Sequence, residues 1–176
     1  MCGSHSFWWL KRAELKAGET VAIFGCGGLG LYAVQLAHRL GAHVIAVDHD
    51  PVKLELAKSF GAEIATSQST ANVCINFAPT TATWDLMLAM VRPRGRIIAA
   101  AMVPEPVALN QEWLLGSGVR IMGTSVGTRE QMVELMKLHA EKALVGFVTR
   151  IELSDITTAL EALENGKAKG RYCIEF

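Results

Sequence analysis

The residues with the clearest chemistry form the run Gly25-Cys26-Gly27-Gly28-Leu29-Gly30, which has the spacing G-x-G-x-x-G. Gly25 can turn the chain where a side chain would clash, and Gly27 lets the backbone approach a pyrophosphate closely. Gly30 lets a following helix pack near the preceding strand. Since the start of that helix presents free N–H groups and a positive dipole end, the run predicts a site for linked phosphates.

A second candidate is Asp48, eighteen residues after the last glycine of this run. Its carboxylate can accept hydrogen bonds from the hydroxyls of an adenosine ribose. The competing role is to cap the next helix, but Asp50 suits that role better because Pro51 follows it at the first helical position. A carboxylate repels a 2′-phosphate, so NAD is favoured over NADP, although His49 and Lys53 lie close enough to weaken this preference.

The elements around these residues strengthen a motif that is weak by itself. An apolar strand at about 20–25 leads into the glycines, a helix at 28–40 follows them, and a second strand at 43–48 ends on Asp48. A nucleotide-binding βαβ unit needs strand, turn, helix, strand and acid in this order. The pattern therefore predicts such a unit.

The rest of the chain continues to alternate between strands and helices. Expected strands lie at 63–66, 73–77, 96–101, 119–125, 147–151 and 172–176, and expected helices at 51–60, 80–91, 110–116, 128–143 and 154–164. A short helix also precedes Gly18. This alternation predicts the α/β class, with a Rossmann-type doubly wound parallel sheet covered on both faces.

One connection is unusually short. About six small polar residues, from Thr66 to Ala71, join the third and fourth predicted strands. Parallel strands normally need a dozen or more connecting residues, usually including a helix. An extended linker of six residues spans roughly 20 Å, so the crossing is possible without one. We expect the helix between the third and fourth strands to be missing or very short, and part of one sheet face to be less covered.

Composition narrows the classes of function. Lys plus Arg and Asp plus Glu are both 17, so no basic excess indicates nucleic-acid binding. The longest apolar stretches are shorter than a membrane span, and the first residues lack the basic-then-apolar order of a signal peptide. We therefore expect a cytoplasmic protein that binds neither nucleic acid nor membrane.

The metal-binding residue types are scattered. Cysteines stand at positions 2, 26, 74 and 173 without C-x-x-C pairs, and histidines stand at 5, 38, 43, 49 and 139. No cluster has the spacing of a zinc site. We therefore predict no metal site within this chain. We also assign no catalytic residue: His5 and His49 are the only candidates near predicted strand or helix ends, and neither is favoured as a catalytic base.

From Leu15 onward the sequence resembles the cofactor-binding half of the medium-chain dehydrogenase/reductase family. It is closest to the zinc-type alcohol dehydrogenase branch. The residues that carry the resemblance are Leu15–Ile23, Gly25–Gly30 with Ala33–Ala37, Gly41–Asp48, Lys53–Lys58 with Gly61 and Ala62, Arg92–Arg96, Ser125–Arg129 and Gly166–Arg171.

The resemblance implies a set of cofactor-binding residues. Gly25, Gly27, Gly28, Leu29 and Gly30 would face the pyrophosphate, Asp48 and Lys53 the adenosine ribose, Phe77 and Ala78 the adenine and the middle of the cofactor, Ala101 and Met102 the nicotinamide ribose, Ser125 and Val126 the carboxamide, and Arg171 a phosphate. On the residues alone, Lys53 could equally be a solvated helix lysine and Arg171 a surface arginine.

The family's G-H-E motif and catalytic zinc ligands, which come from a preceding catalytic domain, are not found here. The resemblance implies that residues 1–18 are an entry helix and linker from that domain, and that 19–176 form the dinucleotide-binding domain. Zinc is expected only in a full-length member. Cys2 stands near a family cysteine, and whether it is a remnant or a coincidence stays open.

The resemblance implies a function with two alternatives. The intact activity would be hydride transfer between NAD and a small alcohol, aldehyde or ketone. The chain could instead be a non-catalytic nucleotide-binding module, such as a sensor or partner subunit, or a relative of the zinc-free enoyl and quinone reductases. Asp48 argues against the last, because those enzymes prefer NADPH.

The predicted strand at 119–125 also bears on assembly. It is apolar on both faces and carries no proline. An edge strand of this kind invites pairing with another copy, and family members form dimers in this way. We therefore expect a homodimer through this strand.

Overall fold

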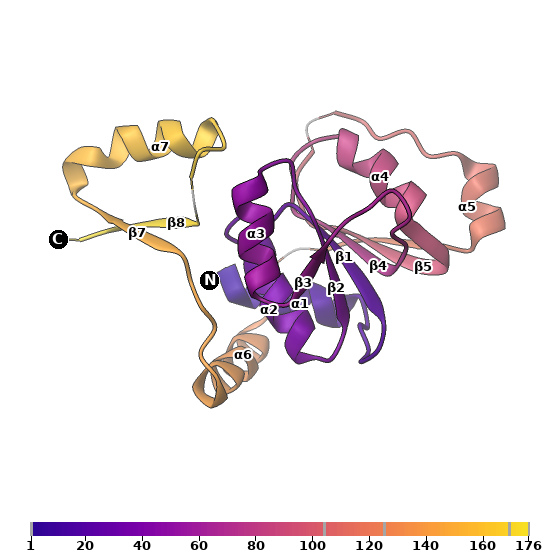
Figure 1. Cartoon of the computed structure of the whole chain (residues 1–176), viewed down its shortest axis with the longest axis horizontal. Coiled ribbons are helices and arrows are strands. Elements are labelled where there is room, and N and C mark those ends of the chain that lie inside the picture. The colour runs from indigo at the N-terminus through magenta and orange to yellow at the C-terminus, as the bar shows by residue number, and fades with distance from the viewer. Residues whose placement is uncertain (1, 104, 125, 169, 176) are drawn as a thin grey trace.

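A six-stranded parallel sheet forms the centre of the protein (Figure 1). The computed structural model describes residues 2–103, 105–124, 126–168 and 170–175, with side chains from residue 5 onward. The strands are β1 (Thr20–Phe24), β2 (His43–Val47), β3 (Ala62–Ile64), β4 (Ala71–Asn76), β5 (Val91–Ala99) and β6 (Arg120–Gly123). Their order, β3-β2-β1-β4-β5-β6, is that of a Rossmann-type sheet and confirms the predicted class.

The order of strands reverses at β1, which pairs with β2 on one side and β4 on the other. Connections leave β1 and β4 in opposite directions, so a crevice opens at their carboxyl ends. The pairing continues just past the strands: the amide of Gly25 donates to the Val47 carbonyl at 2.8 Å, and the amide of Phe77 donates to the Phe24 carbonyl at 2.7 Å. The residues after β1, β2 and β4 thus meet at one edge.

Four helices cover one face of the sheet. They are α1 (Cys2–Arg12), α2 (Gly30–Arg39), α3 (Pro51–Ser59) and α6 (Arg129–Glu141). Their apolar side chains pack against Val21, Ile23 and Ile75 in one buried cluster. This layer fixes α2 against β1, and so it positions the glycine run between them.

The opposite face is covered by α4 (Ala82–Met90) and α5 (Gln111–Ser117), whose Trp84, Met87 and Trp113 pack in a second cluster around Phe24 and Ile97. Figure 1 shows both helices on the same side of the sheet. This face has fewer helices than the first, as expected from the short connection between the third and fourth strands.

That connection is confirmed as helix-free. Residues 65–70, all of them described, join β3 directly to β4. A tight turn shortens the path, because the amide of Ser69 donates to the Thr66 carbonyl at 3.1 Å and the amide of Thr66 donates to Ser69 Oγ at 2.9 Å.

The ends of several elements differ from the sequence prediction. The strand expected at 96–101 begins at Val91, directly after α4, because Val91 pairs with Ala71. The register shifts between Ala71 and Val73, where Arg94 has a φ of 61°. The helix expected from residue 28 begins at Gly30, since the glycines before it form the turn.

The C-terminal residues form a unit of their own, with β7 (Val148–Ile151), a short 3-10 turn at Leu153–Asp155, α7 (Ile156–Glu164) and β8 (Arg171–Ile174). Strands β7 and β8 pair with each other in a two-stranded parallel sheet that is separate from the main one. Figure 1 shows this unit beside α3, at the left of the view. Among the described residues, none of the helices is both long enough and apolar enough to cross a bilayer.

Candidate functional site

A groove of about 590 Å³ lies at the carboxyl edge of the sheet. Its walls come from the turn after β1, the end of β2, the start of α3, the loop after β4, the first half of α4 and the loop before β8. The predicted site residues that line it are Gly25, Gly27, Asp48, Lys53, Phe77 and Ala78. Six predicted residues from four separate segments are therefore brought to one place.

The glycine turn fits the roles that the sequence gives it. A Cβ built on Gly30 would lie 1.8 Å from the Gly25 carbonyl oxygen, so a side chain there would push the turn off α2. Gly25 has a φ of +90°, and a Cβ on it would lie 3.0 Å from the Ala78 amide nitrogen. By contrast, a Cβ on Gly27 would have no neighbour within 4 Å. The bare backbone at Gly27 is thus open to a ligand.

Asp48 ties this turn to the segment after β2. Its Oδ2 accepts a hydrogen bond from the backbone amide of Cys26 at 2.7 Å, and its Oδ1 accepts one from the amide of Asp50 at 2.9 Å. Only 5% of its side chain is exposed. Each carboxylate oxygen can accept a second bond, so two positions remain for hydroxyl donors.

Asp50 caps α3, as predicted. Its carboxylate accepts from the amide of Val52 at 2.9 Å, with Pro51 at the start of the helix. The cap orients the first turn of α3, which carries Lys53 into the groove. There the Lys53 Nζ lies 3.4 Å from the Gly166 carbonyl oxygen and 3.8 Å from Asp50 Oδ2. The Lys53 ammonium is therefore fixed in the groove by contacts with the protein and is not freely solvated.

Arg171 reaches the glycine turn from the C-terminal unit. It is the first residue of β8, and a Cβ built on Gly28 would lie 2.8 Å from its Nε. The guanidinium group thus rests directly against the bare backbone of the turn. Leu29, the remaining residue of the turn, is half-buried beside the start of α2.

Of the residues predicted to contact the nicotinamide end of the cofactor, those that the structure describes do not lie together in the groove. The amide of Ala101 donates to the Asn76 carbonyl at 2.9 Å, which keeps Ala101 beside the end of β4. Met102 is 91% exposed and Val126 is 68% exposed, and neither lines the groove. Ser125 lies outside the described residues.

Sequence reasoning did not identify Trp9 as a neighbour of the site. Its ring centroid lies 5.0 Å from that of Phe77, and the ring of His5 stacks on Trp9 with its centroid at 5.7 Å. The buried Trp9 therefore supports one groove residue from behind. No spacing links α1 to the loop after β4, so the sequence carried no signal for this contact.

Cys26 lies inside the turn but has no nucleophilic character. Burial, and then the negative charge of Asp48, raise the pKa of its thiol to about 12. It is fully buried, so it acts as a small apolar side chain under the turn. Among the described residues, His, Cys, Asp and Glu side chains form no group of three or more that could hold a metal ion.

The groove and the turn beside it thus offer two chemically distinct regions. The bare backbone at Gly27 and the Arg171 guanidinium on the adjoining Gly28 suit phosphates, and the carboxylate of Asp48 with the ammonium of Lys53 suits a ribose. A ligand that spans both would carry a phosphate group joined to a sugar with free hydroxyls.

Comparison with known proteins gives a consistent result. A model of the family described as "zinc-binding dehydrogenase" matches residues 28–141. An alcohol dehydrogenase of Geobacillus stearothermophilus is 30% identical over 179 residues, covering 94% of this chain and 53% of that protein. An alcohol dehydrogenase of Moraxella sp. (strain TAE123) is 31% identical over 182 residues, covering 95% and 53%. The chain spans about half the length of these curated relatives.

Solved structures agree with this. The acetophenone reductase of Geotrichum candidum NBRC 4597, in complex with NAD, superposes with a TM-score of 0.90 at 28% identity, covering 98% of this chain and 53% of that one. The alcohol dehydrogenase of the archaeon Aeropyrum pernix superposes with a TM-score of 0.89 at 29% identity, covering 97% and 54%.

Proposed function

Because this chain belongs to the zinc-binding dehydrogenase family, we propose that it is the NAD-binding part of an alcohol dehydrogenase-like oxidoreductase. The observation that carries the proposal is the contrast between two glycines of the turn. Gly30 is bare because α2 packs on Gly25, whereas Gly27 is bare with open space in front of it. A cofactor pyrophosphate would explain the second glycine, which packing alone does not require.

The residues around the turn support a dinucleotide in one orientation. The pyrophosphate would lie at Gly27 and Gly28, with Arg171 as its counter-charge. The adenosine ribose would bond the remaining acceptor positions of Asp48, and Lys53 would contact the same sugar. Since a carboxylate at this position disfavours a 2′-phosphate, NAD is the cofactor proposed at neutral pH.

The rest of the reaction rests on the family relationship. When bound, NAD supplies the hydride acceptor, and its reduced form supplies the donor. The printed names of the relatives, alcohol dehydrogenase and acetophenone reductase, favour an alcohol, aldehyde or ketone as substrate. We propose that residues 19–176 position the cofactor and that residues 1–18 lead in from a catalytic domain, which would supply the catalytic zinc.

We also propose a homodimer. Strand β6 is the last strand of the main sheet, as predicted, and it pairs only with β5 among the described strands. A second copy could extend the sheet across this edge. Light scattering of the purified chain should give twice the mass of one chain, and a monomeric mass across the accessible concentrations would refute the pairing.

Calorimetric titration with NAD tests the central proposal. Wild-type protein should bind NAD, and Gly27→Val should lose at least roughly tenfold in affinity because its side chain fills the space meant for phosphate. Gly116→Val is the matched control, since a Cβ on Gly116 also meets nothing within 4 Å but stands on α5, away from the groove. A Gly27→Val protein that is folded and binds NAD as tightly as the control would end the proposal.

A further inference from the structure

The carboxylate of Asp48, at the end of the groove proposed for the ribose, already accepts hydrogen bonds from the protein itself. Both oxygens of Asp48 accept backbone N–H bonds, and the side chain is almost fully buried. Hydrogen bonds from amides stabilise a carboxylate and spread its charge toward the donors. The two N–H dipoles therefore offset part of the carboxylate's charge.

The next residue, His49, has the opposite character. It lines the groove with 94% of its side chain exposed, and its Nδ1 lies 3.5 Å from Asp48 Oδ1. A protonated imidazole donates from both ring nitrogens. With Nδ1 turned toward Asp48, the other N–H of the ring remains free for a ligand.

Lys53 lies in the same corner of the groove, by which we mean the group formed by Asp48, His49, Asp50 and Lys53. The Lys53 side chain is 15% exposed, and its ammonium lies near the Gly166 carbonyl and Asp50 Oδ2. One of its three N–H donors is used at the Gly166 carbonyl, and the 3.8 Å from Nζ to Asp50 Oδ2 is longer than a hydrogen bond, so N–H donors remain for a ligand. Lys53 and His49 come from opposite sides of the turn between β2 and α3, and both line the groove.

The net charge of this corner depends on one proton. The charged groups are Asp48 and His49 after β2 and Asp50 and Lys53 at the start of α3. Among the described residues that line the groove, those from the turn after β1, the loop after β4, α4 and the loop before β8 carry no charged side chain. With a neutral imidazole, the two negative carboxylates exceed the one positive charge of Lys53 and the net charge is negative. A protonated imidazole adds a positive charge and makes the net charge zero.

We propose that His49 makes the choice of cofactor depend on pH, an inference that rests on the proposed function. With a neutral imidazole, the corner repels a 2′-phosphate and the groove takes NAD. With a protonated imidazole, His49 and Lys53 together bind the 2′-phosphate, and the groove also takes NADP. Histidine is the side chain that ordinarily changes charge between pH 5 and 8.

The test is a set of calorimetric titrations with NAD and with NADP at about pH 6 and about pH 8. In wild-type protein the ratio of NADP affinity to NAD affinity should rise roughly tenfold on acidification. The 2′-phosphate itself takes up a proton near pH 6, which works against this rise, so variants are needed to isolate the histidine.

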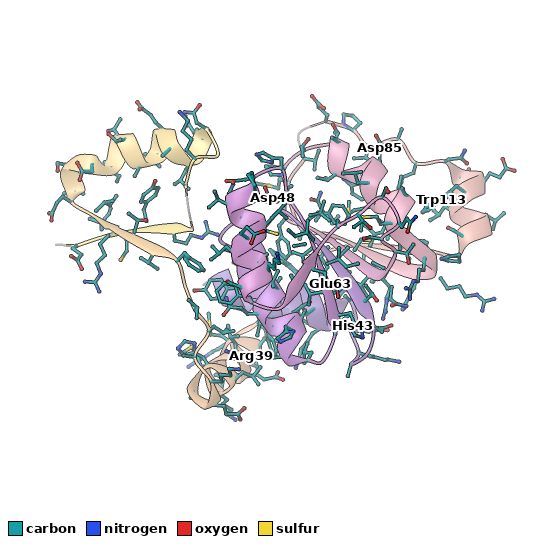
Figure 2. All side chains as sticks on the ribbon, in the orientation of Figure 1. Arg39, His43, Asp48, Glu63, Asp85 and Trp113 are labelled. Atoms are coloured by element: carbon teal, nitrogen blue, oxygen red, sulfur yellow. The ribbon has the colours of Figure 1, made fainter. Side chains whose placement is uncertain are left out.

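Three variants complete the design. In His49→Gln the acid-dependent rise should disappear, and in His49→Lys the ratio should be high at both pH values. His43→Gln is the matched control, because His43 is exposed and stands at the other end of β2 from Asp48 (Figure 2). It should keep the wild-type pH dependence.

The outcomes separate the two proposals. If the wild-type protein binds neither dinucleotide at either pH, the proposed function itself is wrong. If it binds NAD, but the NADP-to-NAD ratio depends on pH equally in wild type and His49→Gln, the cofactor choice does not depend on His49 and this inference is overturned.

Discussion

Oδ2 of Asp48 accepts a hydrogen bond from the backbone amide of Cys26 at 2.7 Å, which joins the end of β2 to the glycine turn after β1. The same side chain also binds the amide of Asp50. Asp48 therefore holds the backbone around its own end of the groove in addition to any role toward a ligand. Two consequences, for stability and for binding, can be measured on one variant.

Asp48→Asn should lose stability as well as NAD affinity. An amide group has only one acceptor oxygen, so either the Cys26 or the Asp50 amide would face an NH₂ donor. A buried donor without a partner costs about 1–3 kcal/mol, to be read from urea unfolding. Asp50→Asn is the control, since Asn caps helices about as well as Asp. Equal unfolding midpoints for the two variants would argue against a stabilising role for the hydrogen bonds that Asp48 accepts from Cys26 and Asp50.

Gly30→Ala should be far more damaging to the fold than Gly27→Val. The new Cβ at position 30 would meet the Gly25 carbonyl oxygen at 1.8 Å, and moving the backbone to relieve it should cost more than about 4 kcal/mol. The side chain of Gly27→Val enters open space, so its thermal unfolding, followed by circular dichroism, should stay close to wild type. Similar melting of both variants would contradict the packing of α2 on the turn.

Arg171→Ala should weaken binding of phosphate-bearing ligands only. Loss of a charge-assisted contact costs about 1.5–3 kcal/mol, or roughly tenfold to a hundredfold in NAD affinity. The affinity for adenosine, which has no phosphate, should not change. Arg150→Ala is the control, because Arg150 belongs to the same small sheet but pairs with Glu175 on an exposed side. A loss of adenosine affinity equal to that of NAD would refute the assignment.

Cys26 and Cys74 should resist alkylation in the folded protein. Burial raises the pKa of both thiols to about 12, and Asp48 adds to the effect at Cys26. A raised pKa keeps the thiol protonated, so at about pH 8 the reactive thiolate is scarce. Of the three cysteines whose side chains the structure describes, Cys173 is the exposed one and should react first with iodoacetamide, as judged by peptide mass spectrometry. In urea Cys26 and Cys74 should react as well, and fast labelling of Cys26 without urea would show that the turn opens.

Local sequence was enough wherever neighbours along the chain make the structure. Asp50 followed by Pro51 predicts the cap of α3, and the cap is present. The few polar residues between Ile64 and Ala71 predict a crossing without a helix, and the crossing is present. In both cases the determining contacts lie within a few residues, so spacing and residue type carry the information.

Contacts between distant segments could not be read in this way. The sequence predicts strands near 147–151 and 172–176, but not that β7 and β8 pair with each other outside the main sheet. It also gave no sign that Trp9 would lie behind Phe77. Such pairs depend on how whole layers pack, and the sequence holds no period or motif that relates their members.

The sequence by itself determined the order of strand, glycine turn, helix and acid, because each of these depends on backbone freedom and hydrophobic period over a short stretch. Only the tertiary structure decided that Arg171 rests on Gly28, that Lys53 meets Gly166, and that both oxygens of Asp48 are bound by amides. These three contacts place the charged groups in and beside the groove. They arise where the chain folds back on itself, so their physical cause is long-range packing rather than local propensity.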